Sequence, residues 1–370
     1  MTMSVCALAR EYARNWQNWS NSTLRALFSM NAIDISARIV LYFTIIKEIH
    51  SIQIGAIAMP EILIAMQAEP RHISQIREAA AACEVVFADA PSDAELARAR
   101  VIVGNVPVDR LAAARQLELV QLQSAGVGAY STLCAPGRGV RVCTASGAYG
   151  LAISEHMFGL LLGLQKRLFS YRDRAGEWCD LGPVRSVSGS NVLVVGLGDI
   201  GGAFARRCKA FGAHVVGIRR SPRPCPEACD AVGVTSDIDR WLPEADIVFL
   251  CVPETGATRH LFDRERIFSM KPGAILLNAG RGTAVDTDAL VDALNAGHLF
   301  GAGLDVTDPE PLPADHPLWA CPNACITPHV SGGLHLAQTH DAIVRIACAN
   351  IRAYLAGAPL TNEVNYERGY

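Results

Sequence analysis

Short apolar runs alternate with longer amphipathic stretches over most of this chain. From residue 61 onward, runs of strand length are followed by segments whose apolar positions recur at helical spacing. A chain that alternates strand and helix in this way predicts parallel sheets with helices on both faces. The predicted strands form two series, residues 62–66, 85–88, 101–103, 119–123 and 140–143, and then residues 192–195, 214–218, 247–252, 274–278, 302–305 and 324–327.

Helices are predicted between these strands, for example at residues 201–211, 286–296 and 336–356. Because the strands come in two series, we expect an α/β fold of two doubly wound parallel-sheet domains. The boundaries we expect place residues 59–154 with 334–370 in one domain and residues 155–333 in the other.

Residues 1–58 lack this rhythm. A secretory signal is disfavoured, because the first basic residue is Arg10 and no compact apolar core follows it. A mitochondrial presequence stays open, since basic residues outnumber acidic ones before Lys47. We favour an extension from an upstream start codon that is not native, with Met59 as the true first residue. Mass spectrometry of the natural N-terminus distinguishes these interpretations.

Composition bounds the class of protein. The chain has 370 residues, of which 50% are hydrophobic and 19% charged, so it can bury large cores and is not intrinsically disordered. Its net charge of −3 provides no basic field, which argues against a nucleic-acid partner. The longest strongly apolar run covers residues 39–46, far short of the roughly 20 that a membrane-spanning helix needs. We therefore expect no membrane partner.

Cysteine usage points to a reducing compartment. Twelve cysteines are scattered without a C-x-x-C pair, and the closest pairs are Cys225 with Cys229 and Cys321 with Cys325. In a chain with an ample core, such cysteines usually act as small buried hydrophobes, which predicts a cytoplasmic location. We expect no metal site, because no group of His or Cys has zinc-ligand spacing.

A glycine-rich turn follows the predicted strand at 192–195. Residues 196–201 read GLGDIG, which is G-x-G-x-x-G between a strand and a helix. Gly196 allows the tight turn, Gly198 lets the backbone approach a pyrophosphate, and Gly201 lets helix and strand pack closely. The free N–H groups at the helix start favour the anion. The pattern predicts a dinucleotide site, although glycines also serve ordinary turns.

The end of the next strand favours one dinucleotide. NAD-binding chains commonly place an Asp or Glu there, but this chain has Arg219, Arg220 and Ser221. Two guanidinium groups and a hydroxyl can bind a 2′-phosphate, which a carboxylate would repel. We therefore predict NADP(H) as the preferred cofactor, with NAD(H) still possible. The alternative is a solvated arginine pair.

Three residues that suit substrate binding and acid–base chemistry follow later strands. Arg281, Glu310 and His329 come after the strands at 274–278, 302–305 and 324–327. In an open parallel sheet, ligands bind beyond the carboxyl ends of the strands, so all three can project into one crevice. An arginine suits a substrate carboxylate, and a histidine beside a carboxylate can give or take a proton near neutral pH. Each residue alone also has an ordinary structural interpretation.

Three segments carry a family resemblance. Residues 270–282 read MKPGAILLNAGRG, residues 303–312 read GLDVTDPEPL, and residues 323–332 read NACITPHVSG. In this order and spacing, the chain from about residue 61 to 365 resembles the D-isomer-specific 2-hydroxyacid dehydrogenases. The resemblance implies a Rossmann cofactor domain at 155–333 and a flavodoxin-like substrate domain formed by 59–154 and 334–370. It also implies a hinge at residues 144–150, next to a helix that contains Glu155.

The resemblance also implies a set of site residues. The catalytic residues would be Arg281, Glu310 and His329, and the substrate would be held by Arg281 and by a loop that contains Ser124, Ala125 and Gly126. Asp305 would lie near the nicotinamide carboxamide. The cofactor-binding residues would be Gly196, Gly198, Asp199, Ile200, Gly201, Arg219, Arg220, Ser221, Val252, Pro253, Thr258, Ala279, Arg281, Asp305, His329 and Gly332.

Some positions depart from the family pattern. Glu254 stands where the family usually has an apolar residue, and Gly128 with Ala129 stand where an Asp is frequent. Formate dehydrogenases of the same scaffold have Gln in place of Glu310, and phosphite dehydrogenases have a Lys near Ala125. Both activities are therefore disfavoured.

The resemblance implies hydride transfer between NADP(H) and a small D-2-hydroxy or 2-oxo acid, such as glyoxylate or hydroxypyruvate. The alternative is a nucleotide-sensing binding protein, like the corepressors built on this scaffold, which would not need the complete Arg, Glu and His set. A homodimer is also implied, through the helix after Glu155. Residues 157–164 are apolar on all sides, which predicts burial either in a core or across a two-fold interface.

Overall fold

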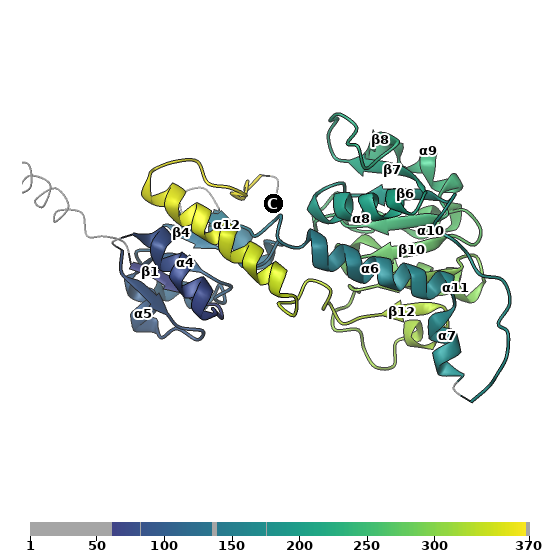
Figure 1. The fold of residues 1–370 in the computed structure, drawn as a ribbon, viewed down its shortest axis with the longest axis horizontal. Helices are drawn as coiled ribbons and strands as arrows, with labels where there is room; N and C mark the ends of the chain where they lie inside the picture. The colour runs from purple at the N-terminus through teal and green to yellow at the C-terminus, as the bar shows by residue number, and fades with distance from the viewer. Residues whose placement is uncertain (1–60, 82, 135–138, 175, 368–370) are drawn as a thin grey trace, which may run out of the picture. The chain divides into compact units, whose positions relative to one another are not determined.

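The computed structural model describes residues 61–81, 83–134, 139–174 and 176–367 (Figure 1). Our interpretation of residues 1–58 lies outside this described part. The described residues at 62–81 and from 85 onward form one compact unit, and this unit contains two β-sheets. Because both sheets belong to the same unit, the boundaries of a substrate domain and a cofactor domain stay predictions.

The first sheet has five parallel strands in the order β2-β1-β3-β4-β5. This is the strand order of flavodoxin-like folds, as predicted. Its register pairs Ile62 with Val85 and Val101 with Leu119. The strands are β1 (Glu61–Ile64), β2 (Val85–Phe87), β3 (Ala99–Val103), β4 (Leu119–Gln121) and β5 (Arg141–Cys143).

The second sheet has seven parallel strands in the order β12-β11-β10-β9-β6-β7-β8. Strand β6 pairs with β9 on one side and β7 on the other, so the strand order reverses there. In doubly wound sheets, ligands bind at such a reversal, beyond the carboxyl ends of the strands. The strands are β6 (Asn191–Val195), β7 (His214–Arg219), β8 (Ala231–Val234), β9 (Ile247–Leu250), β10 (Ile275–Asn278), β11 (Gly301–Leu304) and β12 (Ala324–Ile326).

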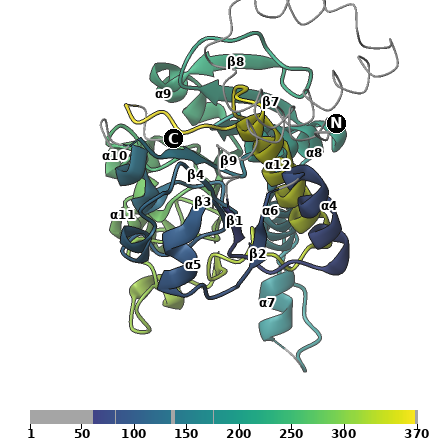
Figure 2. The same ribbon diagram turned by 90° about the vertical axis from the view of Figure 1, so that its left-hand side faces the viewer.

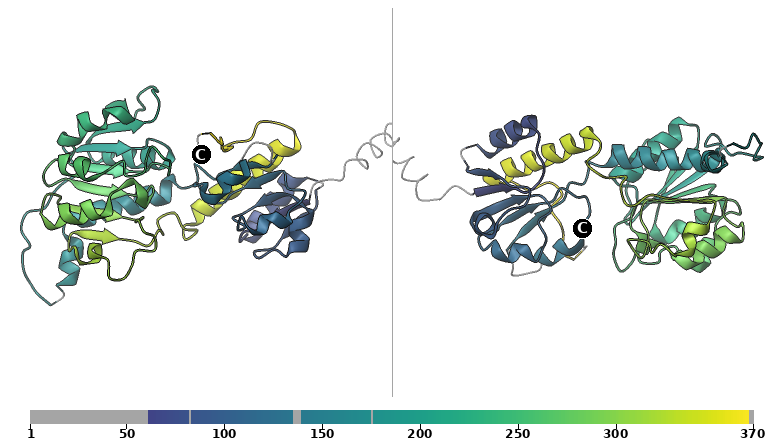
Figure 3. Two further views of the ribbon diagram at one scale, coloured as in Figure 1. Left: turned by 180° about the vertical axis from the view of Figure 1, so that it is seen from behind. Right: turned by 90° about the horizontal axis from the view of Figure 1, so that it is seen from below.

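The C-terminal part of the chain completes the layers around the first sheet. Helix α12 (Ala337–Leu355) packs beside α4 (Pro70–Ala80), although the two are distant in the sequence (Figures 2 and 3). After α12, Val364 N donates to Val142 O at 2.8 Å, so the C-terminal segment also contacts β5. The remaining helix of this part is α5 (Asp93–Arg98).

Helix α6 (Gly150–Gln165) packs against α8 (Asp199–Ala210) and β11. Met157 and Leu161 have no exposed surface within the single chain. The apolar character of this helix is therefore explained by burial in the core, which was one of the two interpretations above. Further α-helices are α7 (Leu168–Asp173), α9 (Ile238–Trp241), α10 (Arg264–Ser269) and α11 (Thr287–Asn295).

Short 3₁₀ turns connect several of these elements. Within the described part of the chain, no helix joins enough length to enough apolar character to cross a bilayer. The 3₁₀ segments are η2 (Arg110–Ala113), η3 (Gly128–Cys134), η4 (Thr235–Asp237), η5 (Leu242–Glu244), η6 (Gly282–Ala284) and η7 (Pro317–Ala320).

The local sequence explains where several elements begin. Helix α5 starts with a capping box, in which Ser92 and Glu95 hydrogen-bond each other's backbone N–H groups. Helix α11 is capped by Asp286, the residue before its first one, whose carboxylate accepts from Ala289 N at 3.0 Å. All four residues of β10 are buried, as expected for a central parallel strand.

The sequence did not predict strand β8. Its residues read AVGV and all four are only partly buried, because β8 is the edge strand beside β7. A short edge strand with a central glycine carries neither a long apolar run nor a clear alternation. The eleven predicted strands all correspond to observed ones, with ends that differ by one or two residues.

Candidate active site

The glycine turn between β6 and α8 has a backbone that only glycine suits at two positions. Gly196 has φ +102°, and a Cβ there would collide with the Cys251 carbonyl. A Cβ on Gly201 would collide with the Gly196 carbonyl and the Cys251 thiol, so this glycine allows helix and strand to approach. Gly198 is exposed and would meet no atom within 4 Å, which leaves room for a ligand beside the backbone.

Cys251, at the end of β9, supports this turn and was missed in the sequence. Its Sγ donates to Gly196 O at 2.8 Å. Burial raises the pKa of the Cys251 thiol well above its ordinary value, so the thiol keeps the proton that it donates. No motif marks such a cysteine, because its role depends on the neighbouring strand.

Asp199, a predicted cofactor residue, has a side-chain contact that the sequence did not reveal. Its Oδ2 accepts from Gly150 N, the first residue of α6, at 2.7 Å. A carboxylate suits the partial positive charge of a helix N-terminus. The Asp199 carboxylate therefore connects the glycine turn to α6, while the predicted contact of this residue with a cofactor stays a prediction.

Strand β7 ends at Arg219, followed by the exposed residues Arg220 and Ser221. The Arg219 Nε atom is buried and has no hydrogen-bond partner among the described residues. A buried guanidinium N–H normally has an acceptor, and an anionic ligand would supply one here.

The loop after β9 contains three predicted cofactor residues, Val252, Pro253 and Thr258. The Thr258 hydroxyl donates to Pro253 O at 2.7 Å and accepts from Thr255 N at 2.9 Å. The Thr258 side chain therefore holds the loop together by hydrogen bonds to the loop's own backbone. Glu254, the unexpected acidic residue, is exposed in this loop.

Arg281 directly follows the turn at the end of β10. Its Nη1 donates to Gly280 O at 2.7 Å, and Asn278 Nδ2 donates to Arg281 O at 2.9 Å. The Nη2 atom lies where a Cβ on Gly126 would stand, so Gly126 must lack a side chain. The structure thus brings together Arg281 and the predicted substrate loop.

The substrate loop is built mostly from backbone and small side chains. Ser124 Oγ donates to Gly126 O at 2.8 Å, and Ser124 O accepts from Ala145 N at 2.9 Å. Ser124, Ala125 and Gly126 are each half-buried. Beside them, the Tyr149 hydroxyl donates to the carbonyl of Gln123, and burial raises the pKa of Tyr149 to about 12.

His329 and Glu310 form a close pair. The His329 Nδ1 and Glu310 Oε1 atoms are 2.6 Å apart, and both side chains are nearly half exposed (45% and 42%). His329 has φ +51°, a left-handed conformation that costs a non-glycine residue roughly 1–2 kcal/mol. A residue held in this conformation beside a carboxylate is a candidate for a chemical role.

Asp305 directly follows β11 and is 2% exposed, and its backbone carbonyl accepts from His329 N at 2.8 Å. Its carboxylate accepts from Thr327 Oγ1 at 2.6 Å, from Val330 N and Ser331 N at 3.1 Å each, and from the Ser331 hydroxyl. A carboxylate has about four lone-pair sites, and these donors use them. The predicted contact with a nicotinamide carboxamide stays a prediction.

Two predicted cofactor residues have backbones in close contact with their neighbours. Ala279 N donates to Leu250 O at 2.9 Å, which joins β10 to β9. Gly332 lies against Ile153 of α6, whose Cδ1 would be 3.2 Å from an added Cβ. Ile200, the second residue of α8, is partly buried.

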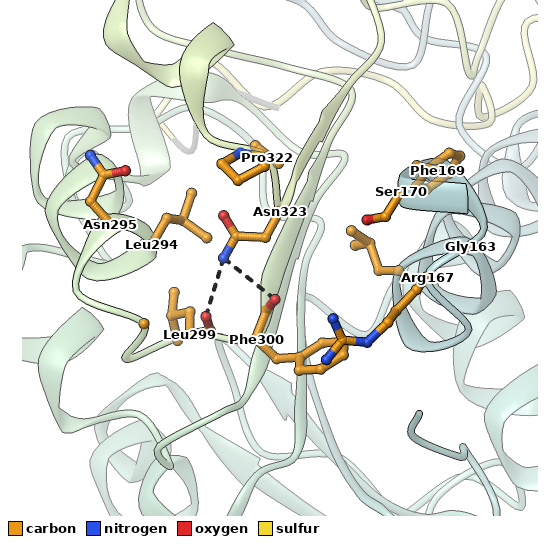
Figure 4. Close-up of a pocket in the computed structure, with 13 residues that line it drawn as sticks. Gly163, Arg167, Phe169, Ser170, Leu294, Asn295, Leu299, Phe300, Pro322 and Asn323 are labelled. Carbon is orange, nitrogen blue, oxygen red and sulfur yellow. Dashed lines mark hydrogen bonds between the residues drawn. The ribbon is translucent and has the colours of Figure 1, made fainter. Parts of the chain in front are cut away.

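A cavity of about 470 Å³ lies elsewhere (Figure 4). Its lining includes Asn323, whose amide donates to Leu299 O and Phe300 O at 3.4 Å each. These residues precede β11 and β12, so the cavity is at the amino ends of the strands. The candidate catalytic residues follow the carboxyl ends, and none of them lines this cavity.

One cluster outside the candidate site has metal-ligand chemistry. Glu69, His72 and His340 place possible ligand atoms within 4.8 Å of one another. Both ring nitrogens of His72 already have protein partners, because Nδ1 accepts from Glu69 N at 3.3 Å and Nε2 contacts Asp341 Oδ1 at 2.8 Å. These hydrogen bonds account for the buried histidine without an ion.

Comparisons with known proteins agree with the resemblance seen in the sequence. Residues 158–331 match the profile of the D-isomer specific 2-hydroxyacid dehydrogenase NAD binding domain. A glyoxylate reductase of Thermofilum pendens is 32% identical over 276 residues, which cover 72% of this chain and 80% of that protein. Glyoxylate/hydroxypyruvate reductase B of Escherichia fergusonii is 37% identical over 220 residues, covering 58% of this chain and 67% of that protein.

A solved structure extends the agreement to the fold. It is a D-isomer specific 2-hydroxyacid dehydrogenase from Xanthobacter autotrophicus in complex with NADPH and MES, with a TM-score of 0.71 and 29% identity over 85% of this chain and all of that one. The family and fold predicted from the sequence are confirmed. The chain therefore belongs to the D-isomer-specific 2-hydroxyacid dehydrogenase family and is a nicotinamide-dependent oxidoreductase that acts on CH–OH donors.

Proposed function

We propose that this enzyme reduces a small 2-oxo acid to the D-2-hydroxy acid and prefers NADPH. The observation that carries the proposal is the His329–Glu310 pair, with 2.6 Å between Nδ1 and Oε1, at the carboxyl edge of the seven-stranded sheet. Arg281, which follows β10 at the same edge, lies against Gly126 of the substrate loop. An acid–base pair and a guanidinium beside a loop of small residues suit a short oxo acid.

The residues present fit a dinucleotide. The glycine turn leaves backbone accessible at Gly198, α8 begins at Asp199, and Arg219 Nε lacks a partner. A helix N-terminus favours a pyrophosphate, and a guanidinium N–H favours a phosphate oxygen. When bound, the nicotinamide ring supplies the hydride that reaches C2 of the substrate.

Residues of the chain itself bind the substrate and donate the proton. The Arg281 guanidinium binds the substrate carboxylate, together with backbone N–H groups of the loop at 124–126. His329 donates a proton to the carbonyl oxygen as the hydride arrives, and Glu310 orients the ring and stabilises its charged form. Because His329 is nearly half exposed, solvent can restore its proton. Asp305 and Gly332 hold the segment that carries His329.

The substrate that we propose for reduction is glyoxylate or hydroxypyruvate. Two relatives bear the names glyoxylate reductase and glyoxylate/hydroxypyruvate reductase, and the loop of small residues suits a short side chain. The test is NADPH oxidation with a panel of 2-oxo acids that includes glyoxylate, hydroxypyruvate, pyruvate and phenylpyruvate. We expect turnover with glyoxylate and hydroxypyruvate. Tight NADPH binding without turnover of any of them would instead favour a nucleotide sensor.

The preference for NADPH over NADH rests on Arg219, Arg220 and Ser221. We expect kcat/KM with NADPH to exceed that with NADH in the wild-type enzyme. In Arg219→Asp the preference should shift toward NADH by at least about tenfold, because a charge-assisted contact to phosphate is replaced by repulsion. Arg240→Asp, in α9, is a matched charge change that should leave the ratio unaltered. A wild-type preference for NADH contradicts the assignment.

A homodimer is the assembly we propose. The stretch from α7 to β6 exposes apolar side chains that the single chain leaves uncovered, namely Leu168, Tyr171, Trp178 and Val184. Large exposed apolar side chains that recur along one segment favour an interface when they form a patch. Sedimentation at micromolar concentration tests this, and a monomer contradicts it. We also propose a cytoplasmic location, which rests on the scattered cysteines of the sequence, since such cysteines usually act as small buried hydrophobes in a reducing compartment.

A further inference from the structure

His329 stands out because its backbone is held in place by a buried polar network. The residue is left-handed, with φ +51°, and its N–H donates to Asp305 O at 2.8 Å and Thr327 O at 3.0 Å. On its N-terminal side the Thr327 hydroxyl donates to Asp305 Oδ1, and on its C-terminal side Val330 N and Ser331 N donate to the same carboxylate. One carboxylate thus fixes the chain on both sides of His329.

The network continues into helix α6. His156 Nε2 lies 3.0 Å from Thr327 Oγ1 and 3.9 Å from Asp305 Oδ1. Since the Thr327 hydroxyl gives its single proton to Asp305, it must accept from His156, which places a hydrogen on Nε2. His156 therefore fixes the direction of the hydroxyl that ties residue 327 to Asp305.

Packing contacts join the same two parts of the structure. A Cβ on Gly332 would lie 3.2 Å from Ile153 and 3.3 Å from Tyr149, both at the start of α6. The segment from Thr327 to Gly332 therefore contacts α6 at both of its ends, through a polar contact at Thr327 and an apolar contact at Gly332. Asp199 in turn accepts from the first N–H of that helix, so α6 also contacts the glycine turn.

We propose that His156 and Thr327 are positioning residues for His329, acting through the Asp305 carboxylate. This inference rests on the proposed function, in which His329 donates the proton. A hydroxyl in the wrong rotamer would release Asp305 on one side, and the left-handed backbone at His329 would then relax. The imidazole would spend less time at the angle that proton transfer requires. Neither His156 nor Thr327 needs to touch the substrate.

The first test removes the hydroxyl and keeps the shape of the side chain. In Thr327→Val we expect kcat for 2-oxo acid reduction to fall at least about tenfold, with KM changed less than about threefold. Thr327→Ser, which keeps the hydroxyl, should restore kcat to within about threefold of wild type. Thr132→Val is the control, because it removes an exposed hydroxyl that donates to Ala129 O at 2.9 Å and should leave kcat unaltered.

A double-mutant cycle tests whether His156 acts through Thr327. His156→Leu alone should lower kcat in the same direction and by a smaller factor. With Thr327→Val already present, adding His156→Leu should change kcat by less than about twofold, since the shared hydroxyl is gone. Losses that multiply independently would overturn the coupling that we propose.

A readout independent of turnover is amide hydrogen exchange of the peptide that spans residues 328–332. Wild type and Thr327→Ser should protect it, and Thr327→Val should exchange at least about tenfold faster. If the wild type is active and Thr327→Val changes neither the exchange rate nor kcat, the positioning role is overturned and the proposed function is retained. A wild type that reduces no 2-oxo acid overturns the proposed function and the catalytic purpose of the network together.

Discussion

Two histidines of this chain contact a carboxylate at nearly the same distance, in very different surroundings. His329 Nδ1 lies 2.6 Å from Glu310, and both side chains are nearly half exposed. His72 Nε2 lies 2.8 Å from Asp341, but the His72 ring has no exposed surface. The first pair follows the carboxyl ends of parallel strands, whereas the second joins helix α4 to helix α12.

The neighbours of each ring explain the difference. The His72 ring packs against the His340 ring, with 4.3 Å between the ring centroids and 59° between the ring planes, and His340 Nε2 contacts Gln67 O at 2.9 Å. Each polar atom of His72 has a fixed partner, so the ring can neither reach a substrate nor exchange a proton easily. His329 has one partner on one nitrogen and access to solvent. A histidine–carboxylate contact therefore indicates chemistry only where the ring keeps a free and accessible nitrogen.

The largest effect that tests this comparison comes from His329→Gln. We expect kcat for 2-oxo acid reduction to fall roughly 10²- to 10⁴-fold, the usual contribution of a general acid, while the urea midpoint of unfolding stays close to wild type. His214→Gln, at the exposed amino end of β7, is the matched control. A variant that keeps near-wild-type kcat removes His329 from the acid–base role.

From His72→Leu we expect a smaller effect, a loss of folding stability with little change in activity. Leucine has a similar size, but it removes from this fully buried position the ring nitrogens that hydrogen-bond the Glu69 N–H and Asp341, which leaves the Asp341 carboxylate with Arg71 as its ion-pair partner. The free energy of unfolding should fall by about 1–3 kcal/mol, measured by urea denaturation, with kcat within about threefold of wild type. If stability were kept and kcat fell instead, the contrast between the two histidines would be wrong.

The smallest expected effect is on the loss of folding stability at low pH, and it concerns Asp341. The hydrogen bond from His72, and then the charges of Arg71 and His72, hold the pKa of Asp341 below its usual range. The resulting stabilisation is present above the unfolded pKa of about 3.9 and is lost as pH falls through the lower folded pKa. Between pH 5 and pH 3, wild type should therefore lose more stability than Asp341→Asn, as measured by urea midpoints. Equal losses would mean that this carboxylate contributes nothing to the acid response.

The glycine turn between β6 and α8 could be predicted because its backbone demands particular residues. Gly196 and Gly201 sit where a Cβ would collide with neighbouring atoms, so the turn leaves a visible spacing in the sequence. Cys251 and the Asp199 contact with Gly150 left no such signal, because each depends on which strand or helix lies beside it. Strand β8 was missed for a related reason, since an edge strand needs little apolar sequence.

The substrate side was less visible. Apart from Arg281, the proposed substrate site consists of small residues at 124–126, and small residues are common in any loop. That Gly126 must lack a side chain becomes evident only when Arg281 is placed against it. Likewise, His156 reads as one residue of an apolar helix until its nitrogen is seen 3.0 Å from Thr327.

The sequence by itself determined the family, the two parallel sheets and the glycine turn, because strand–helix alternation and backbone sterics act over short stretches of chain. The tertiary structure decided which polar groups meet, and in particular that Asp305 holds the chain on both sides of His329 while His72 is enclosed between two helices. The reason is physical. Hydrogen bonds and burial depend on distances between segments far apart in the chain, and those distances exist only once the sheets and helices have packed.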